Sequence, residues 1–367
     1  MTTTKNSFTH KVAVYIGRFQ PFHNGHLALL MRALEVGEKV VVVLGSSFRA
    51  RNTKNPLTWK ERATMIRMSL PDALRERVHF VPVRDYYGTG REGDARWVDA
   101  VCKGVADVVG RDERSIALVG HFKDSSSYYL NHFPGWKLVS CEREGIIDAT
   151  HLRNALYSST LTGREAALAL LAEHMPEGAV NYLKAWLNLP YFKEQSKQWE
   201  KLQEEKLAWA NSPYSPKFIT VDALVTCGEY VLLIERGGDV GEGLYAIPGG
   251  FLEDDESLYQ GALRELREET NLGLAEEYLA EAFKGVYVYD HPGRSERGRV
   301  VTHVHVFELD YEHLPEVSHR SDARKVLWLH KRDLAGLEER YFEDHGHILE
   351  ERIIRQYLAE QAEKAEA

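Results

Sequence analysis

Between residues 11 and 140, short apolar runs alternate with longer segments in which apolar residues recur with helical period. The runs are rich in β-branched residues and apolar on both faces, which is typical of strands covered by helices on each side. Parallel strands need long crossover connections, and the segments between the runs are long enough to be helices. The pattern therefore predicts an α/β unit built on a parallel sheet. The predicted strands are Val12–Ile16, Val40–Leu44, Val78–Val83, Ile116–Val119 and Leu138–Ser140.

The second half of the chain has a different pattern. Helical patterning over about 164–188 leads into a highly charged segment, which ends at the turn-forming sequence Ser212-Pro213-Tyr214-Ser215-Pro216. Two runs with period-2 alternation follow, Phe218–Thr226 and Tyr230–Ile234, and they predict a β-hairpin that opens an α+β unit. A chain of 367 residues has the length of two or three domains. We expect a first domain at 1–189, a helical linker at 190–216 and a second domain at 217–367.

Charge and cysteine usage narrow the class of protein. With 46 basic and 55 acidic residues the net charge is −9, so no overall positive field attracts nucleic acid or anionic lipid. No window of about 18 apolar residues exists, and the amino terminus lacks a signal-like apolar stretch. Cys102, Cys141 and Cys227 are too far apart for a C-x-x-C site and odd in number, which favours a reducing compartment. We expect a cytoplasmic protein with no nucleic-acid or membrane partner, and homo-oligomerisation stays open.

The segment after the first predicted strand, Gly17 to His26, carries the first candidate site. It opens a predicted helix, whose free N–H groups and positive dipole favour phosphate. Gly17 and Gly25 allow the backbone to approach a ligand, and His23 and His26 can present imidazoles to the same phosphate oxygens. Such donors, with Mg²⁺, suit nucleotidyl transfer, in which charge develops on phosphate oxygens. The alternative is that the two histidines only cap the helix.

This segment resembles the H-x-G-H motif of the nucleotidyltransferase superfamily. The sequences Asn55-Pro56-Leu57-Thr58, Gly120 to Tyr129 and Phe133-Pro134-Gly135-Trp136 extend the resemblance to the nicotinamide mononucleotide (NMN) adenylyltransferases of the archaeal type, which implies a Rossmann-like sheet. The second phosphate motif of that family, I-S-x-T-x-x-R, corresponds to Ile147–Arg153, with Asp148 in the place of its serine.

The resemblance implies that NMN attacks the α-phosphorus of ATP through its 5′-phosphate, giving NAD and pyrophosphate. The catalytic residues would be His23, His26 and Arg153. The residues that would bind ATP and its phosphates are Gly17, Arg18, Phe19, Gly25, Thr150 and Arg153. By analogy the nicotinamide ring would contact Trp97, with Tyr128 or Phe133 opposite; the alternative is that these aromatic residues fill a core.

A second candidate site lies in the segment from Gly250 to Leu272. Glu265, Glu268 and Glu269 stand at i, i+3 and i+4, so a helix places them on one face. Three crowded carboxylates repel one another unless a cation intervenes, and hard oxygen ligands suit Mg²⁺ or Mn²⁺. A solvated acidic helix face is the alternative. The full spacing, with Glu256 six residues after Gly250 and Arg264 eight later still, favours the metal site.

That spacing resembles the Nudix box, G-x5-E-x7-R-E-U-x-E-E-x-G-U, in which U is aliphatic, except that Asn271 replaces the final glycine. The resemblance implies an α/β/α sandwich. It also implies metal ligands at Glu265, Glu268 and Glu269, catalytic roles for Glu268 and Glu269, and a bracing role for Arg264 and Glu256. The general base stays unassigned.

Sequences that flank the box are similar to those of ADP-ribose pyrophosphatases. They imply that ADP-ribose is cleaved to AMP and ribose 5-phosphate, and the residues that would bind it are Arg236, Gly249, Gly250, Arg294 and Arg299. Together the two units resemble bifunctional NMN adenylyltransferase/Nudix hydrolases. Two alternatives stay open for the second unit: another nucleoside diphosphate derivative as substrate, or a non-catalytic ADP-ribose sensor.

Overall fold

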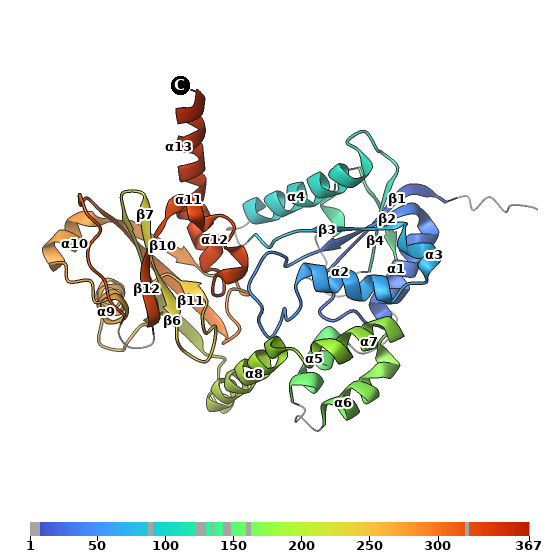
Figure 1. The fold of residues 1–367 in the computed structure, drawn as a ribbon, viewed down its shortest axis with the longest axis horizontal. Coiled ribbons are helices and arrows are strands. Elements are labelled where there is room, and N and C mark those ends of the chain that lie inside the picture. The colour runs from blue at the N-terminus through green and yellow to red at the C-terminus, as the bar shows by residue number, and fades with distance from the viewer. Residues whose placement is uncertain are drawn as a thin grey trace, which may run out of the picture. The chain divides into compact units, whose positions relative to one another are not determined.

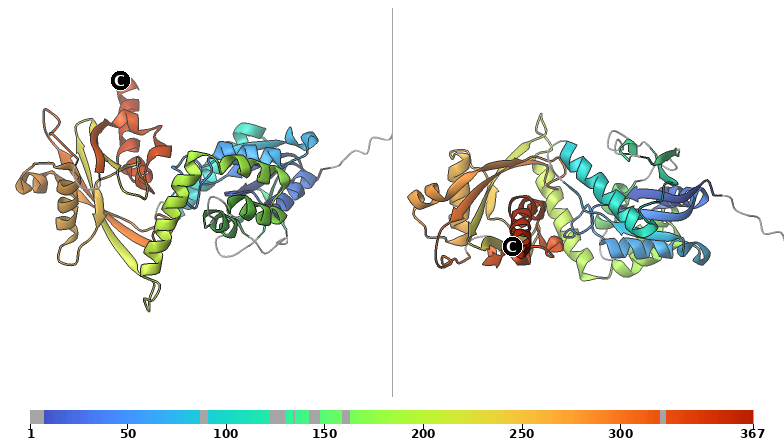
Figure 2. Two further views of the ribbon diagram at one scale, coloured as in Figure 1. Left: turned by 60° about the horizontal axis from the view of Figure 1, so that its bottom comes forward. Right: turned by 90° about the horizontal axis from the view of Figure 1, so that it is seen from above.

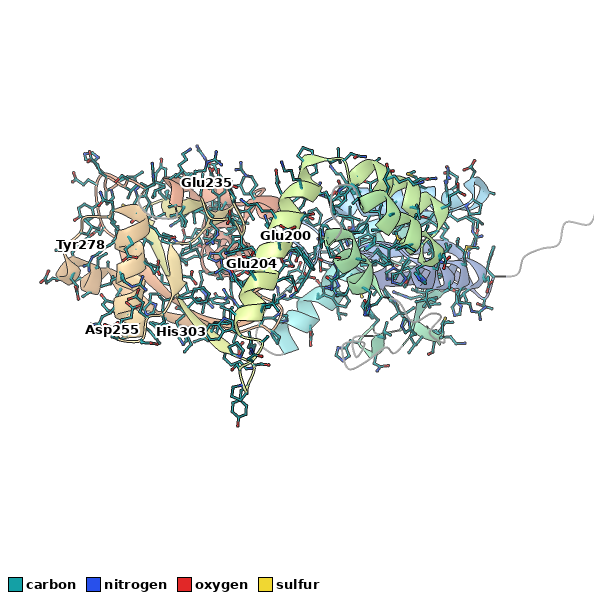
Figure 3. All side chains as sticks on the ribbon, turned by 90° about the horizontal axis from the view of Figure 1, so that it is seen from below. Glu200, Glu204, Glu235, Asp255, Tyr278 and His303 are labelled. Atoms are coloured by element: carbon teal, nitrogen blue, oxygen red, sulfur yellow. The ribbon has the colours of Figure 1, made fainter. Side chains whose placement is uncertain are left out.

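The computed structural model describes residues 8–86, 91–121, 130–133, 135–141, 148–158, 163–319 and 323–366. The chain divides into two compact units, Met1–Ser196 and Lys197–Ala367. The division falls inside one helix, α8 (Pro190–Ala208), which Figure 2 shows as a single yellow-green helix and on which Figure 3 labels Glu200 and Glu204. Each unit has its own sheet and its own core.

The first unit contains a five-stranded parallel sheet of order β3-β2-β1-β4-β5. This confirms the predicted α/β unit. The order reverses between β1 and β4, since the chain adds strands on one side of β1 first and on the other side later. Open parallel sheets bind ligands at the carboxyl ends of the strands at such a reversal. The strands are β1 (His10–Gly17), β2 (Gly37–Leu44), β3 (Val78–Pro82), β4 (Ile116–Gly120) and β5 (Lys137–Ser140).

Helices cover both faces of this sheet (Figure 1). Val101 and Val105 of α4 (Arg91–Val109) pack on Val12 and Val14 of β1, while α1 (Asn24–Val36) packs against β1, β2 and β4. The remaining helices of the unit are α2 (Trp59–Met68), α3 (Asp72–Arg75), α5 (Ala149–Tyr157), α6 (Arg164–Leu171), η2 (Ala172–His174) and α7 (Glu177–Trp186). Burial of the sheet on both sides explains why its strands are apolar throughout.

The second unit is built on a mixed sheet of order β10-β11-β6-β7-β12. The first two strands along the chain, Lys217–Cys227 and Tyr230–Arg236, form the predicted hairpin, which is closed by Gly228 in a positive-φ conformation. Strands β6 and β11 pair in parallel, and the other pairs are antiparallel. The strands are β6 (Lys217–Cys227), β7 (Tyr230–Arg236), β8 (Tyr245–Ala246), β9 (Gly249–Phe251), β10 (Phe283–Tyr289), β11 (Arg299–Leu309) and β12 (Ala323–His330).

Helices lie on both faces of the mixed sheet, as Figures 1 and 2 show. On one face α9 (Leu258–Thr270) and α10 (Glu276–Ala282) bury Leu263, Leu266 and Leu279 against β6 and β11. On the other face Leu334 and Ile348 belong to a separate buried cluster. The elements there are α11 (Lys331–Leu334), η3 (Glu338–Arg340), α12 (His345–Leu349), η4 (Glu350–Ile354) and α13 (Arg355–Glu366). The predicted α/β/α sandwich is confirmed.

Among the helices that the structure describes, none combines the length and the apolar character needed to span a bilayer.

Candidate active sites

The turn between β1 and α1 is shaped by a buried aromatic ring. Phe19 is 1% exposed and has a φ of 53°, which turns its ring back over the end of β1. A Cβ on Gly17 would lie 2.7 Å from Cζ of that ring, so only glycine leaves room for it. Gly17 therefore makes room for the Phe19 ring, and its predicted contact with ATP stays a prediction.

His23 and His26 stand together at the start of α1. Their rings stack with centroids 3.7 Å apart, and the His23 N–H donates to Nδ1 of His26 over 3.4 Å. The interpretation of these residues as a helix cap is therefore correct as far as it goes. Both rings also line a cavity, so capping and ligand binding are compatible in this geometry.

The cavity has a volume of about 430 Å³ and lies at the carboxyl ends of the strands. The predicted residues that line it are Arg18, Phe19, His23, Gly25, His26, Thr150 and Arg153. Further lining residues include Gln20, Arg32, His121, Ser140, Cys141 and Asp148. Arginine and histidine side chains outnumber the one carboxylate in this lining, which favours an anionic ligand such as a polyphosphate.

Asp148, at the position where the family motif has serine, starts α5. Its carboxylate accepts hydrogen bonds from the N–H groups of Thr150 (2.9 Å) and His151 (3.1 Å), which is the capping role that a serine would have. Arg153, one turn further along, donates to the Gln20 carbonyl and to Oγ1 of Thr150. The substitution therefore leaves the helix start intact, and Arg153 ties α5 to the β1–α1 turn.

Two of the three predicted nicotinamide contacts, Trp97 and Phe133, are not brought to the cavity. Phe133 is 6% exposed, stacks on Trp136 with centroids 4.7 Å apart and packs edge-on against Trp97 in the core under α4. Neither Trp97 nor Phe133 is among the described residues that line the cavity. The alternative interpretation, that these rings fill a core, matches their placement. Tyr128 lies outside the described residues.

Two lining residues that are not among the predicted site residues lie at the ends of strands. His121 comes directly after β4, and Ser140 ends β5. The rule that ligands bind at strand ends next to the reversal of strand order could have identified both, once the order was known.

In the second unit, Arg264 is the centre of the carboxylate helix α9. Its guanidinium donates to both oxygens of Glu256, over 2.9 and 2.7 Å, to Glu265 over 2.8 Å and to Glu268 over 3.3 Å. Glu256 lies in the loop before α9, where Figure 3 labels its neighbour Asp255. Arg264 and Glu256 thus hold the loop against the helix, as the resemblance implied.

The other carboxylates of the helix contact the glycines of β9. Glu269 accepts a hydrogen bond from the Gly249 N–H over 2.9 Å, and burial raises its pKa to about 8. A Cβ on Gly250 would lie 2.2 Å from Oε1 of Glu265, whose pKa burial also raises. Glu268 is 54% exposed at its side chain. Gly249 therefore donates a hydrogen bond to Glu269, and the absence of a side chain at Gly250 leaves room for Glu265.

These carboxylates have the right chemistry for a hard divalent cation but are not drawn together. Within the described residues, no three His, Cys, Asp or Glu side chains form a group that could hold a metal ion. The cause is visible in their partners: Arg264 bonds to Glu265 and Glu268, and Gly249 holds Glu269. A cation would relieve the cost of burying Glu265 and Glu269 as anions, so the donor set fits Mg²⁺ or Mn²⁺.

Asn271 ends α9 in the left-handed conformation, with φ 50° and ψ 30°, and its N–H caps the Arg267 carbonyl over 2.9 Å. The expectation that asparagine can replace the glycine of the motif is borne out in this backbone. We predict that Asn271→Val lowers the free energy of unfolding by roughly 1–2 kcal/mol, because a β-branched residue disfavours this conformation. Asn271→Gly should stay within about 1 kcal/mol of the parent. Chemical denaturation followed by fluorescence measures both, and equal losses would contradict the backbone explanation.

The three arginines predicted to bind ADP-ribose have different partners within the second unit. Arg294 forms a buried bidentate pair with Asp344, at 3.0 and 2.9 Å, which corrects the expectation that it is presented to a ligand. Arg299 bonds to the Asp290 carbonyl, and Arg236 lies over Phe342 at 4.1 Å.

Arg297, which the sequence analysis did not select, lies 5.5 Å from the ring of Phe251 and 6.0 Å from that of Phe342. It belongs to the same arginine-rich segment as Arg294 and Arg299.

Comparison with known proteins identifies a family for each unit. Residues 14–112 match the cytidylyltransferase-like family, and residues 216–351 match the NUDIX domain. The chain is 35% identical over 182 residues to a nicotinamide/nicotinic acid mononucleotide adenylyltransferase of Acinetobacter baylyi, covering 49% of this chain and 89% of that protein.

Two crystal structures from Francisella tularensis match almost the whole chain. One, a bifunctional NMN adenylyltransferase/ADP ribose pyrophosphatase complexed with AMP and a Mn ion, is 33% identical with a TM-score of 0.83, covering 93% of this chain and 97% of that one. The other, of a bifunctional NMN adenylyltransferase/ADP ribose pyrophosphatase, is 34% identical with a TM-score of 0.84, covering 94% and 99%.

Proposed function

Because the chain belongs to the family of bifunctional NMN adenylyltransferases/ADP-ribose pyrophosphatases, we propose that it makes NAD in its first unit and hydrolyses ADP-ribose in its second. The observation that carries this proposal is the separation of the two chemistries. A histidine- and arginine-lined cavity belongs to Met1–Ser196, and a carboxylate helix belongs to Lys197–Ala367.

In the first unit, ATP would occupy the 430 Å³ cavity, and the 5′-phosphate of NMN would attack the α-phosphorus. One P–O bond forms as the bond to the leaving pyrophosphate breaks. Charge on the phosphate oxygens is stabilised by Arg18, Arg153, the two histidine rings and the amino terminus of α1. The stacking of His23 on His26 fixes both rings before substrate arrives, so little reorganisation is needed during reaction.

In the second unit, Glu265, Glu268 and Glu269 would hold divalent metal, Mg²⁺ or Mn²⁺, which supplies Lewis-acid polarisation of the diphosphate. Arg264 and Glu256 keep the loop and helix in place, and Gly249 orients Glu269. Water then splits the diphosphate into AMP and ribose 5-phosphate. The intact set of carboxylates supports hydrolysis over a sensor role.

The three cysteines are free thiols, which supports a reducing compartment, and we propose the cytoplasm.

Product analysis tests the proposal directly. The purified chain is incubated with Mg²⁺ and either ATP plus NMN or ADP-ribose, with Mn²⁺ and EDTA in parallel, and the products are separated chromatographically. We expect NAD and pyrophosphate from the first mixture, AMP and ribose 5-phosphate from the second, and loss of hydrolysis in EDTA. Absence of NAD overturns the transferase, and faster cleavage of NADH or a nucleoside diphosphate sugar than of ADP-ribose overturns the proposed Nudix substrate.

A further inference from the structure

Arg62, on the first turn of α2, is a buried guanidinium that the transferase chemistry described so far does not use. It is 0% exposed and is the largest fully buried side chain of the described residues. Its Nη1 donates to the carbonyl oxygens of Arg18 and Gly45, each over 2.7 Å. Its Nη2 donates to Oγ of Ser47 over 3.0 Å. One side chain thus joins the segments that follow β1 and β2.

Among the described residues, the acceptors of the Arg62 guanidinium are neutral carbonyl and hydroxyl oxygens. In the part of the chain that the structure describes, no carboxylate lies within ion-pair distance of it. The two carboxylates that raise the pKa of Arg62 are already paired with other arginines, Asp85 with Arg49 at 3.2 Å and Glu61 with Arg51 at 3.0 Å. Burial lowers the pKa of Arg62 to about 10, with Arg18 adding repulsion, so the group still carries its charge at neutral pH.

The segment that Arg62 holds is fixed from the opposite side as well. Arg153 donates to the Gln20 carbonyl, and the Gln20 side chain bonds to both the N–H and the carbonyl of Leu57, over 3.0 and 2.7 Å. The backbones of Arg18 and Gln20 are therefore held by α2 and α5 respectively, and both residues line the cavity. A shift of the Arg18 carbonyl would therefore move a residue that lines the cavity.

We propose that Arg62 is a positioning residue of the transferase site, which holds the ends of β1 and β2 so that Arg18 faces the nucleotide phosphates, and whose own charge is balanced by those phosphates when substrate binds. This inference rests on the proposed transferase function. A buried cation without a carboxylate partner is costly, and an anionic ligand that binds nearby repays part of that cost. Carbonyl acceptors satisfy the N–H groups but not the charge.

Three variants separate the two roles. Arg62→Met removes both the charge and the hydrogen-bond donors of the guanidinium. Arg62→Lys keeps the charge, but an ammonium cannot reach all of the acceptors. Arg67→Met is the control, since it removes an exposed arginine from the same helix. Each is assayed for NAD synthesis and for dissociation constants of AMP, ADP and ATP by titration calorimetry. Hydrolysis of ADP-ribose by the second unit reports the amount of active chain.

We expect Arg62→Met to weaken ATP binding roughly 10- to 100-fold but AMP binding less than about 5-fold, because a through-space interaction grows with ligand charge. Arg62→Lys should keep the parent ratio of ATP to AMP affinity, while kcat falls about 10-fold because the planar arrangement of guanidinium donors is lost. Arg67→Met should match the parent in every measurement. A role in overall folding alone would weaken the binding of all three nucleotides alike.

Equal weakening of AMP and ATP in Arg62→Met, or an unchanged kcat in Arg62→Lys, overturns the inference. If Arg62→Met fails to fold, Arg62→Lys alone decides. Its kcat tests the role of the guanidinium hydrogen bonds, and its ratio of ATP to AMP affinity tests the role of the charge. Failure of the proposed function looks different, because the parent chain itself would then make no NAD while its nucleotide affinities could still be compared with those of the variants.

Discussion

His26→Ala is expected to lower kcat for NAD synthesis by roughly 10²–10³-fold, the usual cost of removing one fixed donor from a site where phosphate charge develops. The ring stacks on His23 at 3.7 Å and lines the cavity, so its loss removes a donor and also releases its neighbour. ADP-ribose hydrolysis should stay unchanged. Steady-state rates of NAD formation at saturating ATP and NMN measure the effect.

His10→Ala is the matched control, since His10 starts β1 at the end of the strand opposite the cavity. Its NAD synthesis should stay within about 2-fold of the parent. A His26→Ala variant that retains parent kcat would mean that the histidines serve only as the helix cap.

Glu268→Gln is expected to reduce ADP-ribose hydrolysis by roughly 10³-fold, because a charged metal ligand becomes neutral without a change of size. The side chain is 54% exposed and has one long bond to Arg264, at 3.3 Å, so it is free to turn to a cation at little cost. The same exposure means that folding stability should hardly change. Hydrolysis rates across a Mg²⁺ titration, with a thermal melt, test both statements.

Glu277→Gln, on the exposed first turn of α10, removes the same charge from a neighbouring helix and should leave hydrolysis unchanged. If Glu268→Gln lost activity only together with thermal stability, its carboxylate would be structural, and the assigned metal role would be wrong.

Local sequence patterns predicted much of the fold. The strands of the first sheet and the hairpin strands β6 and β7 of the second were predictable because β-branched runs and period-2 alternation are local properties, and β1, β3, β4 and β5 lie within two residues of their expected bounds. The same holds for His23 and His26, which one turn of a helix brings together, and for Arg264 with its carboxylates.

Contacts between segments that are distant in the sequence could not be predicted from it. The pair of Arg294 with Asp344 joins residues fifty positions apart, and nothing near Arg294 in the sequence indicates a buried partner. Whether an aromatic residue such as Phe133 faces a core or a cavity depends on helix packing, which spacing does not determine. Arg62 is a further case: it is fully buried, and nothing next to it in the sequence indicates that strand ends enclose it.

The central claim is that two chemically independent active sites share one chain. The most direct measurement assays NAD synthesis and ADP-ribose hydrolysis side by side in single preparations of His26→Ala and Glu268→Gln. We predict a crossed pattern, in which each variant loses one activity and keeps the other near the parent rate. Loss of both activities in each variant would contradict the account.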